Sequence, residues 1–107
     1  MITSQVETVA AFLRAVIGNN CGLGGTVKFD FGDAGSVLVD GKSAPNKVSD
    51  GRGRSADCTM GLSLETFEKL VLGEIDPSNA YMMGMLRVGG NMVLALKMGP
   101  ILGRGRI

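Results

Sequence analysis

DCTMGLSLETFEKLVLGEIDPSNAYMMGMLRVGGNMVLALKM, residues 57–98, is the stretch that decides the fold. Apolar residues alternate along residues 56–62, which predicts a strand ending at Leu62. Ser63 is a favoured N-cap for a helix over residues 64–73, whose apolar residues recur at helical spacing. Asp76 and Pro77 then start a further helix, because Pro fits the first helical position. This half of the stretch therefore predicts a strand followed by two helices.

The second half of the stretch predicts one more strand and one more helix. Residues 85–89 have the composition of a strand between glycines. Asn91 can cap a closing helix over residues 92–98, which Gly99 and Pro100 are expected to end. The residues that follow, 101–107, show no regular pattern.

The N-terminal half predicts one helix and a run of strands. Ser4 and Glu7 form a capping box at the start of an amphipathic helix that reaches Ile17. Residues 26–31 alternate strictly and predict a half-buried strand. Residues 36–40 predict a second strand, and residues 47–50 a short polar strand at a sheet edge. The predicted class is α+β, with a layer of helices on one face of a sheet.

Composition excludes several classes of protein. At 107 residues we expect a single domain spanning residues 1–107. Eleven Lys/Arg and ten Asp/Glu are interspersed, so we expect no nucleic-acid partner. There is no His and no obvious carboxylate pair, so we expect no catalytic residue, no metal site and no cofactor. We expect Cys21 and Cys58 not to form a disulfide, and Cys58 fits a buried apolar position.

The N-terminus and the length of the apolar runs bear on location. The first residues have neither the charged start nor the apolar core of a signal peptide. The apolar runs are far shorter than the roughly 20 residues that a membrane span needs. We therefore expect a cytoplasmic protein.

Four segments together resemble the sterol carrier protein 2 family. They are residues 57–60 running into 63–70, residues 73–77, residues 80–84 and residues 86–92. The family pattern is a helix ending in G-x-(I/L)-D-P, an A-(F/Y)-M-x-G step, a strand of K/R-V/I-x-G and a closing amphipathic helix. The resemblance implies a five-stranded, mostly antiparallel sheet with helices over one face and an apolar tunnel between them. It also implies a lipid ligand, such as a fatty acid, an acyl-CoA, a sterol or an isoprenoid.

Methionines support this implication, because six of the seven lie from Met60 onward. Met is unbranched and polarizable, which suits a surface that accepts variable apolar shapes, although a Met-rich dry core is the simpler interpretation of composition alone. The candidate ligand-binding residues are Phe12, Val16, Phe29, Met60, Leu62, Phe67, Leu70, Val71, Met82, Met85, Met92 and Leu96. Arg14 and Arg87 are candidates for contact with a lipid headgroup, with a plain surface role as the alternative.

Two functions from different classes stay open. The first is non-catalytic binding or transfer of an apolar lipid. The second is a scaffold or dimerisation module, in a lipid- or quinone-biosynthesis assembly, that uses the same apolar groove against a partner. Transient membrane contact and a homodimer are open as further partners. An enzyme is disfavoured because the chain has no His and its carboxylates are unpaired.

Overall fold

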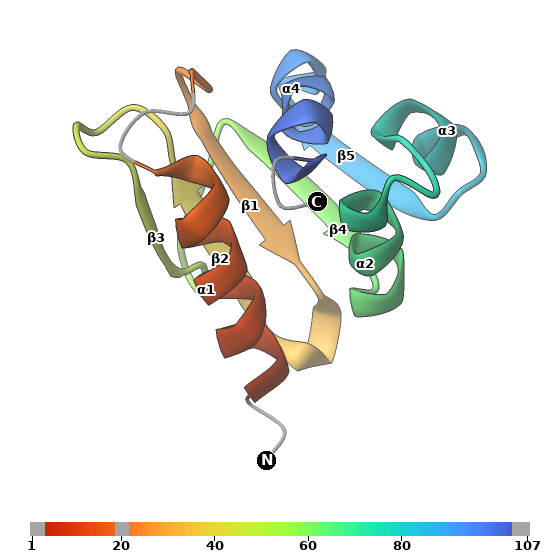
Figure 1. The fold of residues 1–107 in the computed structure, drawn as a ribbon, viewed down its shortest axis with the longest axis horizontal. Coiled ribbons are helices and arrows are strands. Elements are labelled where there is room, and N and C mark those ends of the chain that lie inside the picture. Colours follow the sequence, from red (N-terminus) through yellow and green to blue (C-terminus); the bar gives the residue numbers. More distant parts are fainter. Residues whose placement is uncertain (1–3, 19–21, 104–107) are drawn as a thin grey trace.

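The computed structural model describes residues 4–18 and 22–103, and of residues 4 and 5 the backbone alone (Figure 1). A short 3-10 turn, Gly32–Ala34, joins the first two strands. In chain order the helices and strands are α1 (Ser4–Ile17), β1 (Thr26–Asp30), β2 (Ser36–Asp40), β3 (Lys47–Asp50), β4 (Cys58–Leu62), α2 (Leu64–Leu72), α3 (Pro77–Met82), β5 (Leu86–Gly90) and α4 (Met92–Gly103).

The five strands form one sheet in the order β3-β2-β1-β4-β5. Three neighbouring pairs, β1–β2, β2–β3 and β4–β5, are antiparallel. β1 and β4 are parallel, with Phe29 opposite Met60. The expected α+β class and the five-stranded, mostly antiparallel sheet are therefore confirmed, and β3 lies at an edge as predicted.

The alternation of β1 gives the sheet its two faces. Val27 and Phe29 have no exposed surface, whereas Lys28 and Asp30 point to the other side of the sheet. On that outer side the connection from β3 to β4 passes across β1, and Lys28 Nζ donates to the carbonyl oxygen of Arg54 at 3.1 Å.

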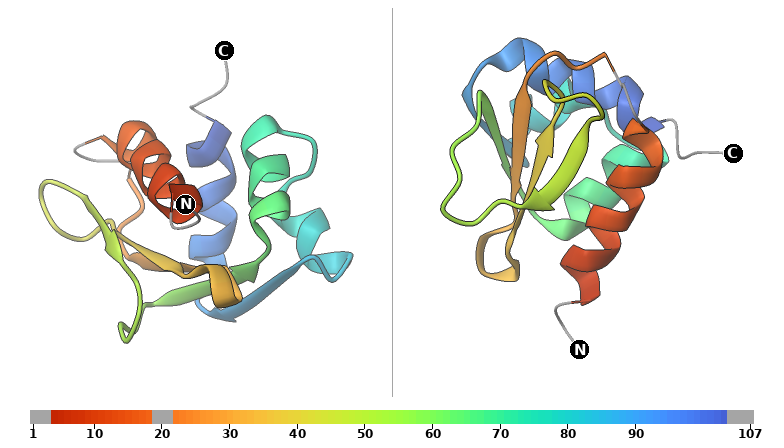
Figure 2. Two further views of the ribbon diagram at one scale, coloured as in Figure 1. Left: turned by 90° about the horizontal axis from the view of Figure 1, so that it is seen from below. Right: turned by 90° about the vertical axis from the view of Figure 1, so that its left-hand side faces the viewer.

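The helices lie together on the inner face of the sheet (Figure 2). α4 packs between α1 and α2 and contacts β1, β4 and β5 beneath it. α1 covers β2 and β3, at the opposite side of the molecule from α3 and β5 (Figure 1). Side chains from this helical layer and from the inner sheet face form one core, whose fully buried members include Leu13, Phe29, Met60, Met98 and Leu102.

Predicted capping residues explain where α2, α3 and α4 begin. Ser63 Oγ accepts from the N–H of Thr66 at 3.0 Å. Asp76 Oδ1 accepts from the N–H of Asn79 at 2.8 Å. Asn91 Oδ1 accepts from the N–H of Val93 at 2.9 Å. The structure does not describe the side chain of Ser4, so its predicted capping role stays a prediction. Cys21 and the residues from 104 onward also lie outside the described residues.

The predicted end of the closing helix is wrong. α4 continues through Gly99 and Pro100 to Gly103, instead of ending at Met98. A proline inside a helix costs about 3 kcal/mol. Ile101 and Leu102 are buried by the extra turn, and full burial of such side chains contributes about 1.5–3 kcal/mol each, which offsets that cost. Pro100 has no N–H to donate to the carbonyl oxygen of Leu96, four residues earlier, and both residues are exposed.

A backbone junction at Asp57 joins the two halves of the sheet. Asp57 Oδ2 accepts from the N–H of Thr26 at 3.1 Å, and its carbonyl oxygen accepts from the N–H of Asn91 at 2.9 Å. Lys42 Nζ lies 3.2 Å from the same carboxylate. Gly90 follows with φ of 85°, and a Cβ there would collide with the carbonyl oxygen of Asp57. Only glycine fits this position.

Candidate functional site

The four phenylalanines of the chain gather at one place under the helices. The ring of Phe67, from α2, is at the centre of this cluster. Its centroid lies 5.4 Å from that of Phe29, 5.7 Å from that of Phe31 and 6.2 Å from that of Phe12, each approached edge-on. Aromatic pairs favour this geometry over a face-to-face sandwich. The Phe12–Phe67 pair joins α1 to α2.

An apolar groove opens above this cluster, between α1 and α2. Its volume is 420 Å³, within the range of about 300–1,000 Å³ that small-molecule sites occupy. Along α2 the groove runs from Leu64 to Val71, a helical rise of about 11 Å. Phe67, with 5% of its surface exposed, separates the groove from the core. The lining residues are Thr8, Val9 and Phe12 from α1 and Leu64, Phe67, Glu68 and Val71 from α2.

The predicted ligand-binding residues fall into three groups in the structure. Three of them, Phe12, Phe67 and Val71, meet in the groove. Others lie beneath the groove or elsewhere in the core and are buried: Val16, Phe29, Met60, Leu62 and Leu70, with Met85 half-buried. Met82, Met92 and Leu96 are exposed on α3 and α4, with Met82 at 77%. The ligand-binding role of each residue stays a prediction.

The tunnel expected between sheet and helices is not shown. Phe29, Met60 and Met98 fill that space with no exposed surface. The groove therefore meets the core at the ring of Phe67, which a long acyl chain would have to displace in order to go deeper.

Val9 and Leu64 line the groove, although the sequence had not indicated them as binding residues. Both belong to apolar stripes with helical spacing, and that signal alone predicts burial without saying which neighbouring helix faces them. Glu68 stands exposed at the rim. The groove thus offers an apolar floor with one carboxylate at its mouth.

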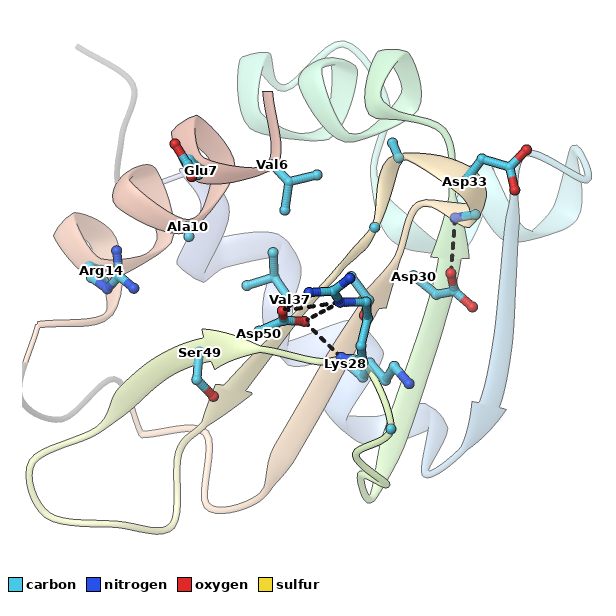
Figure 3. Close-up of a pocket in the computed structure, with 16 residues that line it drawn as sticks. Val6, Glu7, Ala10, Arg14, Lys28, Asp30, Asp33, Val37, Ser49 and Asp50 are labelled. Carbon is cyan, nitrogen blue, oxygen red and sulfur yellow. Dashed lines mark hydrogen bonds and ion pairs between the residues drawn. The ribbon is translucent and has the colours of Figure 1, made fainter. Parts of the chain in front are cut away.

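A second, polar hollow of 730 Å³ lies beside the N-terminal half of α1, toward β2 and β3 (Figure 3). Several of its charged groups contact near neighbours. Arg52 Nη2 donates to Asp50 Oδ2 at 2.9 Å, and this contact lowers the pKa of the Asp50 carboxyl. Asp30 Oδ1 accepts from the N–H of Gly32 at 2.9 Å. Charges of both signs on the walls make this hollow unsuited to an apolar ligand.

Neither arginine proposed for a headgroup lines the groove. Arg14 Nη2 donates to the carbonyl oxygen of Val48 at 3.3 Å, on the side of α1 that faces β3. Arg87 lies on the outer face of the sheet, where its guanidinium covers Gly61; a Cβ at Gly61 would come within 2.9 Å of Arg87 Nη2. The structure favours the surface role for both residues.

Chemically reactive groups are sparse in the described part of the chain. Cys58 is a buried free cysteine, and burial raises the pKa of its thiol, so the nucleophilic thiolate is disfavoured. Within residues 4–18 and 22–103, no three His, Cys, Asp or Glu side chains gather in a way that could hold a metal ion. Among the same residues, no helix has both the length and the apolarity to cross a membrane.

The fold defines a class: a five-stranded mixed sheet with its helical layer on one face and an apolar groove in that layer. Residues 20–103 match the SCP-2 sterol transfer family. The chain belongs to this family, as its resemblance predicted.

Two curated relatives show how much of a longer protein the chain matches. Hydroxysteroid dehydrogenase-like protein 2 of Rattus norvegicus is 37% identical over 67 residues, which cover 62% of this chain and 13% of the rat protein. Sterol carrier protein 2 of Homo sapiens is 33% identical over 67 residues, which cover 63% of this chain and 12% of the human protein. The matched segment is thus a small part of each relative's length.

Solved structures share the whole fold. The sterol carrier protein domain 2 of Helicoverpa armigera has a TM-score of 0.71 at 26% identity, covering 96% of this chain and 91% of that one. Sterol carrier protein 2 of Aedes aegypti, solved with the C16 fatty acid palmitate, has a TM-score of 0.64 at 16% identity, covering 97% and 96%. The ubiquinone synthesis protein UbiJ-SCP2 has a TM-score of 0.66 at 16% identity, covering 90% and 86%.

Proposed function

We propose that this protein binds an apolar lipid in the groove between α1 and α2 and catalyses no reaction on it. The ligand is a fatty acid or another acyl, sterol or isoprenoid lipid. The observation that carries the proposal is the apolar groove itself, with its floor of phenyl rings. Membership of the SCP-2 sterol transfer family and the palmitate complex of a protein with this fold support it.

Apolar burial suffices as the driving force. Each methylene group removed from water contributes about 0.8 kcal/mol, so a chain of about fifteen carbons supplies on the order of 10 kcal/mol before the cost of immobilising it. Such a site discriminates one methylene by only about 1–3 kcal/mol. We therefore expect broad selectivity among acyl chains.

Glu68 is expected to set the orientation of an acyl ligand in the groove. Its carboxylate at the rim repels a second carboxylate, so an ionised fatty-acid headgroup is expected to point to solvent. The apolar tail then packs against Phe12, Phe67 and Val71. Catalysis by the Glu68 carboxylate is tested by adding acyl-CoA esters to the protein. We expect no hydrolysis of the ester. Hydrolysis that Glu68→Gln abolishes would contradict a purely binding role.

A second proposal is that the same groove receives an apolar helix of a partner protein or of a second copy. The apolar floor of the groove supports this proposal as it supports the first, and a protein named for ubiquinone synthesis shares the fold. Native mass spectrometry separates the two: lipid bound to a monomer supports the first proposal, and a lipid-free dimer supports the second. Delivery of cargo between membranes and a cytoplasmic location stay predictions.

The test of lipid binding uses two neighbouring positions of α2. Val71 lines the groove, whereas Leu72 is exposed and does not line it. We expect delipidated wild-type protein to bind a fluorescent fatty-acid analogue. Val71→Glu should weaken binding at least about tenfold, because the apolar ligand would desolvate a carboxylate. Leu72→Glu is the matched control and should bind as wild type. No binding by the wild type, or equal losses in both variants, would overturn the proposal.

A further inference from the structure

The two edge strands of the sheet, β3 and β5, differ in how their outer edges are protected. On β3, the carbonyl oxygen of Val48 accepts from Arg14 Nη2 at 3.3 Å, and Lys47 and Asp50 are exposed beside it. Such contacts and charges protect a sheet edge against the addition of a further strand. β5, at the right-hand margin of the sheet in Figure 3, carries one charged residue, and that side chain lies over the face of the sheet.

The hydrogen-bond ladder between β4 and β5 fixes which backbone groups of β5 point away from the sheet. The N–H of Asn91 donates to the carbonyl oxygen of Asp57 at 2.9 Å, and these two residues continue the register of the strands. Hydrogen-bonded pairs alternate with non-hydrogen-bonded pairs in an antiparallel ladder, so the odd-numbered residues of β5 bond to β4. The N–H and C=O groups of Leu86, Val88 and Gly90 therefore point outward. A row of such groups is matched by another β-strand, and burial in hydrocarbon would leave it unpaired.

The edge of β5 is complementary to itself about a two-fold axis. In the antiparallel pair that uses all the outward groups, Val88 lies opposite Val88 of a second copy and Leu86 lies opposite its Gly90. β-branched side chains favour such a cross-strand contact. Every outward N–H then meets an outward C=O of the other copy, so the edge can be satisfied without any other kind of partner.

The charge of Arg87 does not oppose this pairing. Its guanidinium covers Gly61 of β4, where a Cβ would come within 2.9 Å of Arg87 Nη2. The charge is therefore held on the side of β5 that is away from the free edge. In the two-fold pair, Arg87 faces Gly89 of the second copy, which has no side chain, so no two like charges lie directly opposite each other.

Exposed apolar side chains lie at both ends of β5. Met82 and Met83, with 77% and 67% of their surface exposed, come before the strand. Met92 and Val93, with 37% and 58% exposed, come directly after it. Antiparallel pairing places the start of one strand beside the end of the other. The methionines of each copy therefore approach Met92 and Val93 of the other copy, which extends the contact beyond the strands.

The area of contact favours a second copy over a short peptide. An edge of five residues is only about 17 Å long. A peptide that covered this edge alone would bury much less than the roughly 800 Å² per partner of a stable interface. We propose that two copies of this protein pair through β5 in antiparallel orientation and form one continuous sheet. This dimer leaves the groove beside α1 open, because α1 and β5 lie at opposite sides of the molecule (Figure 1), and the inference does not depend on lipid uptake.

Hydrogen exchange of single amides, followed by NMR at about 50 µM and about 1 mM protein, locates the contact. We expect the amides of Leu86 and Val88 to exchange at least about fivefold more slowly at the higher concentration, because only the dimer pairs them. The amides of Arg87 and Gly89 bond to β4 and should be protected at both concentrations. Sedimentation over the same range should show a monomer–dimer equilibrium.

Two outcomes of these measurements would overturn the proposal. The first is a protein that stays monomeric at about 1 mM, an affinity too weak for a specific dimer. The second is a dimer in which the amide of Val88 exchanges at the same rate at both concentrations. Such a dimer would use another surface, and its loss in Val71→Glu would assign the contact to the groove between α1 and α2.

Charge changes at Gly89 test the register of the pair. A Cβ at this position meets open space, and residue 89 of one copy faces Arg87 of the other. The dimer Kd should therefore rise at least about threefold in Gly89→Lys and fall at least about threefold in Gly89→Glu. Ala11→Lys and Ala11→Glu make the same charge changes on an exposed position of α1 and should shift the Kd by less than about twofold. Equal shifts at both positions, or shifts of one direction in both Gly89 variants, would contradict the pairing.

Folding and lipid uptake are measured on the same variants. Circular dichroism of the Gly89 variants should match that of the wild type. If it does not, Val88→Pro replaces them, because it removes an outward N–H that bonds to nothing within one copy, and it should abolish the dimer. Uptake of the fluorescent fatty-acid analogue by Gly89→Lys should equal that of the wild type, so failure of the dimer and failure of lipid binding are distinguished.

Discussion

Replacing the central ring of the aromatic cluster gives a quantitative test of how α1 and α2 hold the groove. Phe67→Leu keeps an apolar side chain but removes three edge-on ring contacts, at 5.4, 5.7 and 6.2 Å. Each such contact contributes about 0.5–1.5 kcal/mol beyond area burial, and the losses are not fully additive. We expect the free energy of unfolding to fall by about 2 kcal/mol, which lowers Tm by about 8–16 °C in a domain of this size.

Urea unfolding followed by circular dichroism measures this loss. A double-mutant cycle then isolates one contact: Phe12→Leu and Phe67→Leu should couple by about 0.5–1.5 kcal/mol. Phe12→Leu with Val88→Ala is the matched control. Because α1 and β5 lie on opposite sides of the molecule, its coupling should be near zero (Figure 1).

Ligand binding should change the coupling energy between Phe12 and Phe67 and leave the coupling energy between Phe12 and Val88 unchanged. An acyl chain packed on the floor of the groove contacts the rings of both Phe12 and Phe67, so their coupling at saturating fatty acid should differ from the coupling in the free protein. A loss below about 0.5 kcal/mol in Phe67→Leu, or a Phe12–Phe67 coupling no larger than that of the control, would refute the reasoning.

Three further predictions concern stability and reactivity. Gly90→Ala should lower Tm strongly, because φ of 85° and the Asp57 carbonyl both reject a Cβ; Gly89→Ala, where a Cβ meets open space, is the control for calorimetry. The N–H of Thr26 and then the Lys42 ammonium lower the pKa of Asp57, so its contribution to stability is full above about pH 4 and is lost as pH falls through the lowered pKa. Acid unfolding should therefore show a smaller pH dependence in Asp57→Asn, and an unchanged dependence would contradict this. The buried thiol of Cys58 should resist Ellman's reagent until urea unfolds the chain; rapid labelling of the native Cys21→Ser variant would show otherwise.

Local chemistry in the sequence predicted most elements of the fold. Alternation placed Val27 and Phe29 on the inner face, and Ser63 and Asp76 marked the starts of two helices correctly. The parallel pairing of β1 with β4 could not be derived in this way, because strand order depends on where a long connection crosses the sheet. The end of α4 was missed because Pro100 is a local signal, whereas the burial of the residues after it is a tertiary effect.

The candidate site shows the same division. Phe12, Phe67 and Val71 lie on apolar helical stripes, and the structure brings them together in one groove. Met82 and Leu96 belong to equally apolar segments but face solvent. The type of a side chain predicts whether its transfer out of water is favourable. It does not say whether the folded chain or another apolar phase will bury that side chain.

The most direct test of the central claim is the contact between ligand and rings. All four phenylalanines belong to the cluster, so protein labelled with carbon-13 in its Phe rings gives four ring systems to assign. With one equivalent of palmitate, we predict intermolecular nuclear Overhauser effects from the acyl methylenes to the rings of Phe12 and Phe67. Bound palmitate that shows no such effects to these two rings would contradict a lipid site between α1 and α2.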